Sequence, residues 1–184
     1  MRITIIVWLA LLAITFTSCK NEKSGEKDPK KDVEQNSANN FFRVTLDVVA
    51  KKDDSFHVFY LEDQTSNFTE EKSMWSEFKG SEESQKLVFD LPKGKVPKQL
   101  RIDYGLNKEQ GEVKINSIEI SYKGKVKLIP GSEYFKYFRP NLENTIVDVG
   151  KQTVKALVKS GDQFEGPSTY PLETLTAELQ NLNK

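Results

Sequence analysis

The residues best suited to bind a ligand lie between Tyr60 and Asp103. Trp75 and Phe78 stand in a polar background, and Tyr60 follows a run of aromatic and β-branched residues. Sugar rings present apolar C–H faces that stack on exposed aromatic rings, while charged side chains bond the hydroxyls. Arg101 and Asp103 are two residues apart on a strand-like segment, so their side chains share one face. Together they predict a carbohydrate site, with Trp75 as the stacking platform and Tyr60 or Phe78 beside it.

Each of these residues has a structural alternative. Aromatic side chains are the main core fillers of small β-sandwiches, so the alternative for Trp75, Tyr60 and Phe78 is packing in the core. The alternative for Arg101 and Asp103 is a charged pair on a solvated face, without a ligand. The residue types leave these alternatives open.

Catalytic, metal and cofactor chemistry has little support in the sequence. His57 is the single histidine, and its place in an aromatic strand predicts a structural role. The chain contains no G-x-S-x-G sequence and no glycine-rich phosphate loop. Asp53 and Asp54 predict a hairpin tip rather than a calcium site, because two adjacent acids are too few ligands. We therefore predict no catalytic residue, metal or cofactor; a hydrolase with a hidden carboxylate pair is the enzymatic alternative.

Alternating apolar and polar residues predict about eight short β-strands. Residues 41–50 and 55–62 are expected to pair as a hairpin. Three consecutive strands between Gln85 and Tyr122 are expected to form the central sheet. The remaining strands are predicted at 125–129, 144–150 and 152–160.

Two interruptions of the alternation are informative. The apolar phase changes by one residue near Asn116 and Ser117, which predicts a β-bulge there. Residues 63–84 show no sustained period, so we expect an irregular segment that carries Trp75 and forms the site region.

The last residues switch to a helical period. Pro171 precedes leucines spaced three and four residues apart, which predicts a short amphipathic helix. Docking of this stripe on its own domain is expected, and a partner protein is the alternative. The stripe consists of Leu172, Leu175, Leu179 and Leu182.

Many short strands without long intervening helices predict an all-β fold, an antiparallel β-sandwich of the jelly-roll type. The segments FFRVTL, FHVFYLE, KLVFDLP, LRIDYG and VKINSIEISYKG, within residues 41–124, resemble the β-sandwich domains attached to bacterial membrane glycosyltransferases and the galactose-binding-like modules. This resemblance favours the jelly roll over an immunoglobulin-like topology. Tyr104 stands where those domains often have proline.

The amino-terminal residues have the pattern of a sorting signal. Residues 1–18 contain one basic residue and an apolar run shorter than the roughly 20 residues that span a bilayer, which predicts a cleaved leader. Cys19, the single cysteine, directly follows small polar residues, which resembles the lipobox of bacterial lipoproteins, although Phe16 departs from it. The resemblance implies lipidation at Cys19, a lipid anchor, and a Gram-negative outer membrane, on the periplasmic or the cell-surface side. The alternative is a secretory leader with a free thiol.

Composition predicts how the rest of the chain is divided and which partners it binds. Residues 19–40 carry mixed charges and few apolar side chains, which predicts the lipidated cysteine followed by a disordered tether; residues 41–184 form the domain. The 27 basic and 27 acidic residues cancel, so a nucleic-acid partner is not expected. The partners considered are a glycan and, as the alternative, an envelope protein bound by a structural or assembly lipoprotein.

Overall fold

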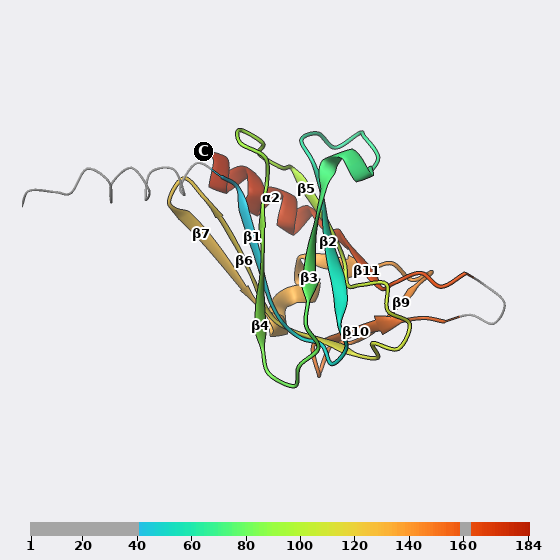
Figure 1. Cartoon of the computed structure of the whole chain (residues 1–184). Helices are drawn as coiled ribbons and strands as arrows, with labels where there is room; N and C mark the ends of the chain where they lie inside the picture. The colour runs from blue at the N-terminus through green and yellow to red at the C-terminus, as the bar shows by residue number, and fades with distance from the viewer. Residues whose placement is uncertain (1–40, 159–162) are drawn as a thin grey trace, which may run out of the picture.

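Two antiparallel sheets pack face to face in a β-sandwich (Figure 1). The computed structural model describes residues 41–158 and 163–184, and eleven strands lie in these ranges. The predicted leader, Cys19 and the tether lie outside the described residues. In the described part of the chain, no helix is both long enough and apolar enough to cross a membrane.

Each sheet draws its strands from distant parts of the sequence. The six-stranded sheet has the order β4-β1-β6-β10-β9, and β7 also pairs with β6. Its strands are β1 (Arg43–Val49), β4 (Gln85–Asp90), β6 (Val113–Tyr122), β7 (Lys125–Pro130), β9 (Thr145–Asp148) and β10 (Thr153–Ala156). The five-stranded sheet has the order β3-β2-β5-β11-β8. Its strands are β2 (Asp54–Leu61), β3 (Ser73–Phe78), β5 (Gln99–Asp103), β8 (Phe138–Pro140) and β11 (Ser168–Pro171).

The chain crosses between the sheets from β1 to β2, from β3 to β4, from β4 to β5 and from β5 to β6. The predicted all-β fold, an antiparallel β-sandwich, is confirmed. The predicted hairpin of the first two strands is wrong, because β1 pairs with β4 and β6 while β2 pairs with β3 and β5. The expected central sheet between Gln85 and Tyr122 is also wrong, since β5 lies in the opposite sheet to β4 and β6. Alternation marks a strand but carries no information about which sheet it joins.

The core lies between the two sheets. Because apolar and polar residues alternate along the strands, each sheet turns one apolar face toward the core. In β1, the side chains of Val44, Leu46 and Val48 are fully buried and their neighbours are half-buried. The predicted bulge in β6 is confirmed, because Asp47 pairs with Ser117 and Val48 pairs with Ile115, which leaves one β6 residue without a partner.

Hydroxyl groups inside the core tie three elements together. Tyr104 follows β5, Tyr134 belongs to the 3₁₀-helix η2 (Gly131–Lys136), and Thr169 lies on β11. The Tyr134 hydroxyl lies 2.8 Å from Thr169 Oγ1 and also contacts the Tyr104 hydroxyl. Burial raises the pKa of both tyrosines well above the usual value, so they stay neutral donors and acceptors.

The carboxy-terminal helix α2 (Glu173–Asn183) packs against β5, β6, β7 and β11. Leu175, Leu179 and Leu182 of its stripe are buried, and Lys127 Nζ on β7 lies 2.7 Å from Glu178 Oε1. The predicted docking of this helix on its own domain is confirmed. The apolar stripe of the helix is therefore covered by strands of its own domain.

Three strands escaped the sequence prediction. β8 and β11 have only three and four residues, too few to establish a period. β3 lies at the edge of its sheet within the segment expected to be irregular, and one of its six residues is buried. An edge strand with a largely exposed sequence lacks the alternation that identifies a strand.

Candidate functional site

The candidate site lies on the face of the five-stranded sheet that points away from the core, here called the outer face. On β2, Phe56 and Val58 enter the core, so His57 and Phe59 point to the outer face. The strand register places His57 between Trp75 on β3 and Asp103 on β5. One row further, Phe59 is the partner of Arg101. The outer face therefore gathers aromatic and charged side chains from neighbouring strands.

Trp75 is a rigidly supported, exposed aromatic ring. Its indole stacks on the imidazole of His57, with 3.7 Å between ring centroids and 19° between ring planes. Trp75 nevertheless keeps 50% of its surface exposed. β3 is the edge strand, and among the described residues it pairs only with β2 in its sheet, the strand that carries His57. The ring is therefore supported by the imidazole, while half of the residue surface remains exposed.

His57 is buried beneath this site, at 1% exposure. Its ring lies between Trp75 and Phe59, whose centroid is 3.8 Å away. Its Nε2 atom makes no hydrogen bond within the described part of the chain, and the nearest carboxylate oxygen, of Glu70, is 3.6 Å away. Burial lowers the pKa of His57 and the Arg101 charge lowers it further, whereas Glu70 acts in the opposite direction.

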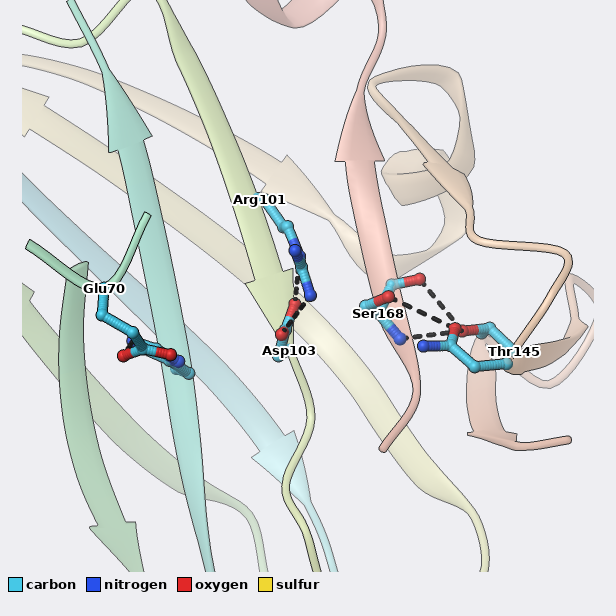
Figure 2. Close-up of polar contacts among 7 residues, drawn as sticks. Glu70, Arg101, Asp103, Thr145 and Ser168 are labelled. Carbon is cyan, nitrogen blue, oxygen red and sulfur yellow. Dashed lines mark hydrogen bonds and ion pairs between the residues drawn. The ribbon is translucent and has the colours of Figure 1, made fainter. Parts of the chain in front are cut away.

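Arg101 is held by one carboxylate and two aromatic rings. Its Nε and Nη2 donate to the two carboxylate oxygens of Asp103 at 2.8 and 2.7 Å (Figure 2). Its guanidinium lies over the ring of Phe59 at 4.8 Å and over Tyr170 at 5.1 Å. Arg139 approaches Tyr170 as well, at 5.2 Å. This packing fixes Arg101, so it forms a structural bridge between β2, β5 and β11.

A second polar group beside β11 is structural. Thr145 Oγ1 accepts from the Ser168 backbone N–H at 2.7 Å, and it lies 2.7 Å from Asn144 Oδ1 (Figure 2). All three side chains are buried. These hydrogen bonds anchor the start of β9 to β11, and they leave no activated hydroxyl for nucleophilic chemistry.

The structure separates the predicted site residues into two groups. Trp75, Arg101 and Asp103 share the outer face, although Trp75 lies on a strand and not on the expected irregular segment. Tyr60 and Phe78 are buried in the core and do not accompany Trp75 at the surface. The segment before β3 instead supplies Phe68, edge-on to Phe59 and Tyr170, and Glu70 from the 3₁₀-helix η1 (Glu70–Lys72).

Sequence reasoning missed several members of this site. The spacing of His57 and Phe59 by two residues was a usable signal, since it places both on one strand face. Tyr170 had no such signal, because a strand more than sixty residues from Arg101 in sequence brings it there.

The arrangement suits recognition better than acid–base catalysis. Burial raises the pKa of Asp103, and the Arg101 bridge opposes this by holding both carboxylate oxygens. A carboxyl group bound on both oxygens is poorly placed to exchange a proton with a substrate. Within residues 41–158 and 163–184, no group of three or more His, Cys, Asp or Glu side chains could hold a metal ion.

The pH dependence of stability reports on His57. We expect the free energy of unfolding to fall as the pH drops from about 7.5 to 5.5, because the unfolded chain binds the proton more tightly than buried His57 does. His57→Phe keeps a stacked ring without a titrating group, so its stability should change less over this interval. Urea unfolding of both proteins at several pH values measures the difference. Equal pH slopes would contradict the assignment, since His57 is the single histidine.

The chain matches no protein-family model, no curated protein and no solved structure. The functional conclusion therefore rests on the outer face itself and on the amino-terminal sequence.

Proposed function

We propose that this protein is a non-catalytic lipoprotein of the Gram-negative cell envelope that binds a glycan on the outer face of its five-stranded sheet. The observation that carries the glycan proposal is Trp75, an indole that stacks on His57 and keeps half of its surface exposed. A pyranose ring can stack its C–H face on such a platform. Because the indole is already ordered, little conformational entropy is lost on binding.

Polar groups for sugar hydroxyls lie close to the platform. Glu70 approaches the imidazole on which Trp75 stacks, and its side chain is 73% exposed. A free carboxylate accepts hydrogen bonds from hydroxyl groups, which fixes the orientation of a stacked ring. Arg101 and Asp103 bind each other on the same face, so they stabilise the strands beside the platform and are not its main ligand contacts.

The anchor is proposed from the sequence. The apolar leader at 1–18 ends at Cys19, which is the proposed site of lipidation, and the polar residues to position 40 separate it from the domain. Such an anchor holds the domain at the outer membrane, facing the periplasm or the exterior.

An envelope protein remains the alternative partner. The leucine stripe of α2 packs against its own sheets, so it is not offered to such a partner. A protein partner would need another surface, and the exposed indole favours the glycan.

A glycan array with purified protein tests the proposal. We expect the wild type to bind a subset of sugars, and Trp75→Ala to weaken that binding by about 30-fold, or ~2 kcal/mol. Val88→Ala is a matched control, because Val88 is 47% exposed on a strand of the other sheet. Its binding should equal that of the wild type. No binding by folded wild-type protein, or unchanged binding by Trp75→Ala, would refute the proposal.

A further inference from the structure

A polar depression adjoins Trp75 along β2 and β3. It has a volume of about 530 Å³ and is lined by Asp53, Asp54, Ser55, Glu77, Phe78 and Lys79. Ser55 and Glu77 are partners in the strand register, just as His57 and Trp75 are partners in the next row. Alternate residues of a strand share a face and lie about 6.6 Å apart. Two of its lining residues, Ser55 and Glu77, therefore lie one row from the stacking platform on the same face.

Two of the acids in the depression are already used by the fold. Asp53 accepts from Lys79 Nζ at 2.7 Å and from the Gly80 N–H at 2.8 Å. Asp54 accepts from the backbone N–H groups of Leu106 at 2.8 Å and Asn107 at 3.1 Å. These contacts shape the depression and leave its remaining polar groups for other partners.

The groups left over suit a polyhydroxylated ligand. Within the described residues, the Glu77 carboxylate forms no ion pair closer than 4.0 Å, and neither Glu77 nor the Ser55 hydroxyl forms a side-chain hydrogen bond. The ammonium group of Lys79 donates to Asp53 through one of its hydrogens, which leaves further donors. An acceptor and a hydroxyl thus lie one row from the aromatic platform, and a donor follows two residues beyond Glu77.

We infer that this depression is a second subsite, which binds the sugar unit next to the one stacked on Trp75. The inference rests on the proposed glycan function and deepens it, because it makes an oligosaccharide of two or more units the preferred ligand. The charged residues around the depression also indicate which class of sugar it binds. Asp53, Asp54 and Glu77 outnumber Lys79 in the depression, and Glu70 lies beside the platform, so uncharged sugars are favoured over uronic acids.

Calorimetric titration with sugars of one to four units tests the inference. The probes are oligomers of glucose, of mannose and of N-acetylglucosamine, with oligomers of galacturonic acid as the acidic series. For a neutral series that binds, we expect affinity to rise about tenfold from one unit to two. Glu77→Gln and Ser55→Ala should each lower the affinity for two-unit sugars by about threefold to tenfold. The affinity for one-unit sugars should stay unchanged in both variants. The acidic series should bind more weakly than the neutral series. Glu77→Gln should reduce this difference in affinity.

Glu119→Gln is the matched control, because Glu119 is a strand residue of the other sheet. Its titrations should match those of the wild type. The second subsite would be refuted if two-unit sugars bound no more tightly than one-unit sugars and neither Glu77→Gln nor Ser55→Ala changed the affinity. The glycan function would still stand if Trp75→Ala weakened binding in the same experiment. Absence of binding to every series would overturn both.

Discussion

Gly105→Ala is expected to lower the free energy of unfolding by about 4 kcal/mol. Gly105 has a φ of +97°, and a Cβ there would lie 2.1 Å from Asp54 Oδ2. The carboxylate would have to move away from the backbone N–H groups of Leu106 and Asn107, which it holds at 2.8 and 3.1 Å. The variant would therefore combine backbone strain with the loss of charge-assisted hydrogen bonds. Urea unfolding of the variant and the wild type measures the resulting loss of stability.

Gly111→Ala separates these two causes. Gly111 lies in the same connection between β5 and β6 and has a φ of +72°, but no described residue other than its two sequence neighbours has an atom within 4 Å of the position of its Cβ. It should lose only the strain of a left-handed residue, about 1 kcal/mol. If both variants lose the same stability, the contact with Asp54 is not what requires glycine at 105.

Arg101→Ala is expected to lower the free energy of unfolding by about 3 kcal/mol. The Arg101 and Asp103 side chains are 23% and 20% exposed, so the variant leaves a largely buried carboxylate without its partner. It also removes the guanidinium that packs against Phe59 and Tyr170. Because burial raises the pKa of Asp103, the loss should shrink as the pH falls and this carboxyl becomes protonated.

Arg43→Ala provides a control with the same chemistry. Arg43 Nε and Nη2 bind Asp90 at 2.6 and 2.8 Å across β1 and β4, but these side chains are 41% and 40% exposed. A surface pair of this kind contributes less than about 1 kcal/mol. Urea unfolding of both variants at pH 7 tests the comparison. Similar losses would show that burial of the Arg101 pair is not decisive.

The local pattern of residues was enough to predict most elements of the fold. A period of two identified β1, β2, β4, β5 and β6, and the leucine spacing identified α2, because burial of one face imposes these periods. The same rule placed Arg101 and Asp103 on one face and located the bulge near Asn116. These properties depend on neighbours in sequence, so the sequence carries them.

The pairing of strands and the candidate site depended on tertiary structure. Period two says which residues share a face, but not which sheet a strand joins, so the pairing of β1 with β4 and β6 could not be predicted. Trp75 is exposed because it points to the outer face from an edge strand, whereas Tyr60 on β2 and Phe78 on the same edge strand point into the core. An aromatic residue fits a core or a ligand site equally well by type. Only the position of its strand and the direction of its side chain, both products of long-range packing, decide between them.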